Sequence, residues 1–118
     1  MTDQNTPSRS CLPHHKLIAY RVAVELLLAV KAANVRDAKL RDEATRAAKS
    51  ACLNAAEGAG RVTRADKARA FAIARGEAGE AAAAVEIAAR VGEADLDAAA
   101  RCIEIAGRLV ALLTGLVR

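Results

Sequence analysis

The sequence predicts an all-α protein, an antiparallel up-and-down four-helix bundle formed by residues 14–118. Three observations favour this fold. Hydrophobic residues make up 53% of the chain but aromatic residues only 2%, and alanine, the strongest helix former, supplies much of the hydrophobic fraction. Apolar residues recur at steps of three and four along four segments, and short polar or glycine-containing connections separate these segments. No stretch shows a competing strand pattern, so four helices with short links are the expected architecture.

Residues 1–13 are predicted to form a disordered N-terminal arm, because they are polar and contain Pro7 and Pro13. The first helix is expected over residues 15–33. Its apolar residues at helical spacing are Ala19, Ala23, Leu26, Val30 and Ala33. Further apolar residues widen this stripe beyond one face, which is typical of a helix that is covered on more than one side.

The second helix is expected over residues 37–57, with Asp37 as the side chain that caps its N-terminus. Its predicted inner seam consists of small residues only: Ala44, Ala47, Ala48, Ala51 and Ala55. Gly58 and Gly60 follow this seam. Because glycine adopts a left-handed backbone conformation without a steric penalty, these two glycines are predicted to end the helix.

The third helix is expected over residues 64–91, and the spacing of Thr63 and Asp66 resembles a capping box at its start. The seam of this helix repeats in alternating steps of three and four: Phe71, Ala74, Ala78, Ala81, Val85 and Ala88. Gly76 and Gly79 lie inside the helix, where each costs about 1 kcal/mol relative to alanine. Their presence predicts close contact with a neighbouring helix.

The fourth helix is expected after a turn at Gly92, with Asp95 as its cap, and runs to about residue 117. It has the richest apolar surface of the chain, arranged as two faces. The face predicted to fill the core comprises Ile103, Ala106, Val110, Leu113 and Val117. The second face is predicted to contact another copy of the chain, in a homo-oligomer, through Ile105, Leu109, Leu112 and Leu116.

The charge of the chain is mildly basic, with a formal net charge of +4, and the basic residues concentrate between residues 36 and 75. Six of them on the second and third helices are candidate nucleic-acid contacts: Arg41, Arg46, Lys49, Arg61, Arg64 and Lys67. Lysine and arginine contact phosphates without regard to sequence, so binding would depend on charge and shape. The alternative is an ordinary solvated helix surface. Tyr20 and Phe71 are assigned to the core, which leaves no aromatic side chain for base stacking.

The junction between the second and third helices contains a dense polar motif. Glu57 lies in the last turn of a helix, where the helix dipole disfavours a carboxylate, so Arg61, Arg64 or Arg75 is expected to pair with it. Asn54, one turn earlier, is expected to bond free carbonyls or the turn backbone. We interpret one group as a structural corner, with a ligand or RNA contact as the alternative: Asn54, Glu57, Gly58, Gly60 and Arg61.

The corner motif, Asn54-Ala-Ala-Glu-Gly-Ala-Gly-Arg61, resembles the Asn-Ile-Ala-Glu-Gly-x-Gly-Arg signature of the 23S rRNA intervening-sequence protein family. The resemblance extends over nearly all of the chain beyond residue 14. It implies a four-helix bundle, commonly a homopentamer, whose molecular function is unsettled. Distant relatives of that family are nucleic-acid-binding accessory proteins of diversity-generating reverse transcriptases. One departure is Cys52, which stands where the family usually has proline.

No pattern in the sequence indicates an enzyme, a cofactor or a metal. Cys11, Cys52 and Cys102 match no zinc-ligand spacing, and no Glu-x-x-His motif is present. The polar start of the chain does not read as a secretory signal, and no apolar run is long enough to span a membrane. We therefore expect a cytoplasmic, non-enzymatic, homo-oligomeric binding or assembly module. The alternative is an RNA-binding accessory protein that uses the basic face of the second and third helices.

Overall fold

The computed structural model describes residues 11–118, which contain helices and connecting turns and no strand. The elements are a 3-10 turn η2 (Pro13–Lys16) and the helices α1 (Ile18–Ala32), α2 (Ala38–Gly60), α3 (Arg64–Arg90) and α4 (Leu96–Val117). The prediction of an all-α protein with four helices is confirmed. Most of the predicted N-terminal arm, residues 1–10, lies outside the described residues. Residues 15 and 16, which were predicted as the start of the first helix, belong to the turn η2 instead, and α1 begins after this turn.

Three helices begin at the side-chain caps that the sequence predicts. Each cap accepts a hydrogen bond from the backbone N–H three residues later: Asp37 at 2.9 Å, Thr63 at 3.1 Å and Asp95 at 2.9 Å. These bonds satisfy one of the free N–H groups at each helix start. The turn predicted at Gly92 is confirmed, and Gly92 adopts a left-handed conformation there, with a φ of +80°.

The predicted end of α2 is wrong. The helix continues through Gly58 and Gly60, neither of which has a positive φ, and it ends where Arg61 adopts an extended conformation. The backbone N–H of Arg61 still bonds the carbonyl of Glu57, at 3.1 Å. Helix α2 therefore ends because Arg61 is extended, and not because a glycine adopts a left-handed conformation. Helix termination does not explain why positions 58 and 60 are glycine.

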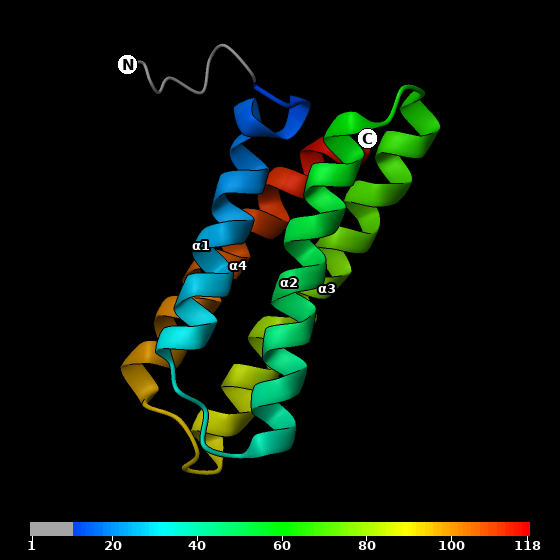
Figure 1. The fold of residues 1–118 in the computed structure, drawn as a ribbon. Coiled ribbons are helices and arrows are strands. Elements are labelled where there is room, and N and C mark those ends of the chain that lie inside the picture. Colours follow the sequence, from blue (N-terminus) through cyan, green and yellow to red (C-terminus); the bar gives the residue numbers. More distant parts are fainter. Residues whose placement is uncertain (1–10) are drawn as a thin grey trace, which may run out of the picture.

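The helices lie side by side in chain order, and α1 also contacts α4 (Figure 1). The α1–α2 and α3–α4 connections meet at one end of the molecule, where the backbone N–H of Arg36 donates to the carbonyl of Glu93 at 2.7 Å. The start of α1, the α2–α3 turn and the end of α4 lie at the other end. None of the four described helices is long and apolar enough to cross a membrane.

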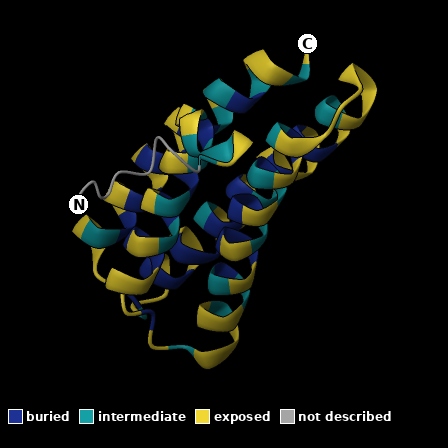
Figure 2. Ribbon diagram, turned by 45° about the horizontal axis from the view of Figure 1, so that its top comes forward, coloured by how far each residue is buried: buried dark blue, intermediate teal, exposed yellow. Residues whose placement is uncertain are grey.

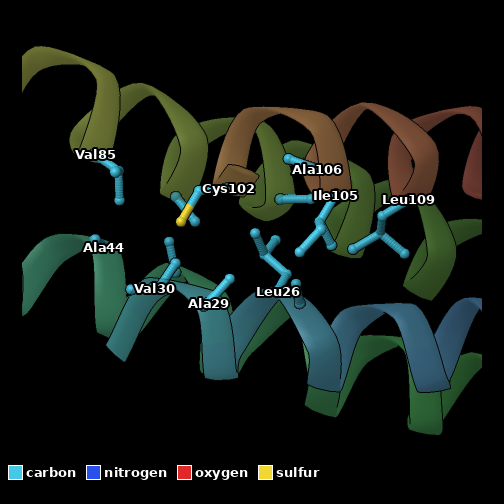
Figure 3. Packing of buried hydrophobic residues seen from close by; sticks show 14 of the residues in the cluster. Leu26, Ala29, Val30, Ala44, Val85, Cys102, Ile105, Ala106 and Leu109 are labelled. Carbon is cyan, nitrogen blue, oxygen red and sulfur yellow. The ribbon is translucent and has the colours of Figure 1, made fainter. Parts of the chain in front are cut away.

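The core runs between the four helices and consists mostly of alanine. The predicted alanine seam of α2 and the predicted seam of α3 are buried throughout (Figure 2). Larger side chains fill the space between α1 and α4, where Leu26 faces Ile105 and Leu109 (Figure 3). Because alanine buries little apolar area, each contact between helices contributes less stabilisation than a leucine-rich seam would.

Gly76 and Gly79 do not make the close helix contact that the sequence predicts. Both are exposed on α3, and a Cβ added to either would meet no atom of the described chain within 4 Å. The reason is their position around the helix axis, since these glycines lie on the side of α3 opposite to its buried seam. They form part of an outer surface of the chain.

Candidate functional site

The corner between α2 and α3 contains an ion pair between Glu57 and Arg61. Of the three predicted partners of Glu57, the structure selects Arg61, four residues later. Hydrogen bonding to Glu57, together with its negative charge, raises the pKa of Arg61. The pair is half-exposed, so it stabilises the corner only weakly in water.

Gly58 allows α2 and α3 to approach closely at the same corner. A Cβ on Gly58 would lie 2.5 Å from Cε1 and 2.6 Å from Cδ1 of Phe71, distances that real Cβ contacts essentially never show. Phe71 is buried, with 4% of its surface exposed. Gly58 is therefore required by packing between helices, whereas Gly60 faces open space.

Asn54 does not bond the turn, contrary to expectation. Its side-chain amide donates to the carbonyl and to the hydroxyl of Ser50, at 2.9 and 3.1 Å, within α2. The free carbonyls at the end of α2 are bonded instead by Lys67, whose ammonium group donates to Gly58 at 3.3 Å and to Ala59 at 3.0 Å. Sequence reasoning missed this role of Lys67.

A groove of about 360 Å³ follows the corner along α2 and α3. Its lining residues are Asn54, Glu57, Arg61, Asp66, Arg69, Ala70 and Ile73. Two arginines and two carboxylates make the lining electrically neutral. Such a groove offers no excess positive charge to a polyanion, so the corner motif does not by itself form a phosphate site.

Arg46, the central residue of the predicted basic face, lies among three carboxylates. Its guanidinium donates to Glu43 and Glu80 at 2.8 Å and to Glu77 at 3.3 Å. The hydrogen bond from Arg46 lowers the pKa of Glu43. The Arg46 charge is compensated within the chain, so its prediction as a phosphate contact is not supported.

The other predicted cations are also largely engaged. Arg64 donates to the backbone carbonyl of Arg118 at 3.1 Å, and Arg41 donates to the carbonyl of Val35 at the same distance. Lys49 is exposed and makes no hydrogen bond or ion pair with another described residue. The predicted basic face of α2 and α3 is therefore mostly a set of internal ion pairs and backbone contacts.

Two of the four residues predicted to form the oligomer interface on α4 lie in the core of the chain instead. Ile105 and Leu109 are buried inside the chain, with 3% and 0% exposed, while Ile103, predicted to be core, is 40% exposed. Leu112 and Leu116 do line a surface groove of about 400 Å³ between the start of α1 and the end of α4. The remaining lining residues are Lys16, Leu17, Ile18, Ala19 and Gly115, so the groove is almost entirely apolar.

The described residues hold no group of three or more His, Cys, Asp or Glu side chains that could bind a metal ion. Two of the cysteines, Cys52 and Cys102, are buried in the core. Burial raises the pKa of the Cys52 thiol to about 11 and also raises that of Cys102. Both thiols are therefore poor nucleophiles at neutral pH and act as small apolar core residues.

A family profile described as 23S rRNA-intervening sequence protein matches residues 15–115. The chain belongs to this family. The match covers α1, α2, α3 and all but the last two residues of α4, and it includes the corner motif from Asn54 to Arg61 that first indicated the resemblance. A comparison with curated proteins found no match. Membership of the 23S rRNA-intervening sequence protein family names no activity for this chain.

Proposed function

We propose that the chain is an antiparallel up-and-down four-helix bundle that acts as a non-enzymatic, homo-oligomeric assembly module in the cytoplasm. The contacts between helices support the bundle, because each helix contacts the next one in the chain and α1 also contacts α4. Short connections between consecutive helices favour antiparallel neighbours.

The main support for self-association is the location of the small and the large apolar side chains. Alanine fills most of the interior, whereas many of the large aliphatic side chains are exposed. Ile18, Leu53 and Leu116 are 60%, 71% and 38% exposed. Full burial of one such side chain contributes about 1.5–3 kcal/mol. An alanine-rich bundle therefore gains considerable stability if further copies cover these residues.

The groove between α1 and α4 is the proposed contact surface, and its occupant is a second copy of this chain. Ile18 and Leu116 form its exposed apolar rim. Leu53 is a further exposed aliphatic residue, on α2, and it does not line the groove. A contact between two different surfaces of identical copies builds a ring when the rotation closes. The family resemblance implies five copies.

Light scattering after size exclusion tests this proposal with the variant Ile18→Glu. A charge in the groove rim is expected to dissociate the oligomer, while the wild type elutes with the mass of several copies, near five. Leu96→Glu is the matched control, since Leu96 is similarly exposed but lies at the start of α4, at the opposite end of the molecule. The control is expected to keep the wild-type mass. A monomeric wild type at micromolar concentration would refute self-association.

The alternative prediction, an RNA-binding accessory protein that uses the basic face of α2 and α3, is less well supported. Five of its six cations donate hydrogen bonds within the described chain, although Arg41 does so through Nη1 alone, and Lys49 makes none there. Salt-sensitive retention of RNA that is lost in Lys49→Glu would favour this alternative over assembly alone.

A further inference from the structure

A small cleft lies between the end of α1 and the start of α2, separate from both grooves described above. It has a volume of about 130 Å³ and is lined by Val30, Lys31, Asn34, Val35, Arg41 and Thr45. Two cationic and two neutral polar side chains line it, and no described carboxylate does. The cleft therefore differs in kind from the neutral groove at the α2–α3 corner.

Arg41 is held in a fixed orientation at this cleft. Its Nη1 donates to the carbonyls of Val35 and Arg36, at 3.1 and 3.3 Å. Its Nε and Nη2 make no hydrogen bond with another described residue, so they can donate to a ligand. A guanidinium group that is already ordered loses little side-chain entropy when its planar fork binds an oxyanion.

Lys31 and Thr45 also line the cleft, whereas Lys49 lies beyond its lining. Thr45 lies one helical turn after Arg41 and Lys49 lies one turn further, so the three residues share one stripe of α2. Lys31 approaches from the last turn of α1. Thr45 supplies a hydroxyl group and Lys31 an ammonium group, and both groups donate hydrogen bonds to phosphate oxygens.

The floor of the cleft is apolar, because Val30 and Val35 are 4% and 1% exposed. Charges interact more strongly beside such a floor than in open water, since the effective dielectric constant is lower there. The volume is well below the range of about 300–1,000 Å³ of sites for drug-sized ligands. The space suits one compact oxyanion group better than a whole nucleotide.

We propose that this cleft binds a phosphate group through Lys31, Arg41 and Thr45, with Lys49 at its margin. The phosphate belongs either to a small phosphorylated molecule or to a nucleic-acid backbone that crosses the α1–α2 surface. The proposal is independent of self-association, because neither the cleft nor Lys49 contributes to the α1–α4 groove.

The test compares the double variant Lys31→Gln/Lys49→Gln with the control Arg90→Gln/Arg101→Gln, which has the same net charge and alters exposed residues outside the cleft. Arg41 is left intact because it also holds the α1–α2 connection. In the first assay, inorganic phosphate or pyrophosphate is added at constant ionic strength and the unfolding midpoint is measured. Phosphate is expected to raise the midpoint of the wild type and the control, and the cleft variant should lose this shift.

In the second assay, the affinity for a short labelled RNA is measured over a range of salt concentrations. If the cleft contacts the backbone, the slope of log K against log salt becomes shallower by about 1 for each lysine removed, and the control keeps the wild-type slope. A response to phosphate alone supports the cleft and assigns it to a small phosphorylated ligand. Equal responses from the cleft variant and the control, or no wild-type response in either assay, would overturn the proposal.

Discussion

The corner between α2 and α3 makes a sharp prediction for the variant Gly58→Ala. Gly58 has a helical backbone, so alanine is compatible with its local conformation and by itself stabilises a helix by about 1 kcal/mol. An alanine Cβ would, however, lie within 2.9 Å of three ring atoms of Phe71. The two effects have opposite signs, and the packing of Phe71 decides which one prevails.

The magnitude follows from the freedom of that ring. Phe71 is 4% exposed and belongs to the alanine-lined core, so it cannot move into solvent to accept a methyl group. Overpacking of a well-packed core typically costs 1–3 kcal/mol. With three contacts below 3 Å we expect a cost of about 3 kcal/mol, which leaves a net destabilisation of about 2 kcal/mol after the helix-propensity gain.

Thermal and urea unfolding measure this difference, and Gly76→Ala is the matched control. Gly76 is an exposed helical glycine with no atom near its would-be Cβ, so its substitution should stabilise the protein by about 0.5–1 kcal/mol. The double variant Gly58→Ala/Phe71→Leu should lose less stability than the sum of the two single variants, because the smaller side chain removes the clash. A stabilising Gly58→Ala, or full additivity with Phe71→Leu, would refute the close-approach explanation.

Two further substitutions test other local features. Gly92→Ala places a Cβ at a φ of +80° and should destabilise the protein by about 1–2 kcal/mol in urea unfolding, whereas the helical control Gly107→Ala should not. Arg46→Gln should lower the unfolding midpoint at pH 7. The pKa of Glu43 is lowered in the folded state, so its contribution is present above the unfolded-state pKa and is lost as the pH falls through the folded-state value. The difference between Arg46→Gln and the wild type should therefore shrink in acid, and an unchanged difference at pH 3 would contradict this role.

The features that the sequence predicted correctly are local ones. Capping by Asp37, Thr63 and Asp95 requires only a side chain and a backbone N–H three residues later. The seams of α2 and α3 were also predictable, because small apolar residues at steps of three and four form one continuous stripe along each helix. Arg61 was one of three partners that the sequence left open for Glu57, and the pair that forms is the local one, four residues apart.

The features that could not be predicted depend on tertiary contacts. The helix α4 is apolar on more than one side, so periodicity did not distinguish the face of Ile103 from the face of Ile105 and Leu109. The compensation of Arg46 by Glu77 and Glu80 joins residues 31 and 34 positions apart, from two helices. Gly58 was assigned to a helix end because its real contact, the ring of Phe71, becomes visible only when α2 and α3 are packed.

Self-association through the α1–α4 groove is the central claim, and the mass of Ile18→Glu in solution tests it most directly. Light scattering at micromolar concentration is expected to give an oligomer for the wild type and for Leu96→Glu, independent of salt, and a folded monomer for Ile18→Glu. Circular dichroism would verify that the variant keeps its helices. A wild type that is monomeric under all conditions, or an Ile18→Glu variant with the wild-type mass, would contradict the account.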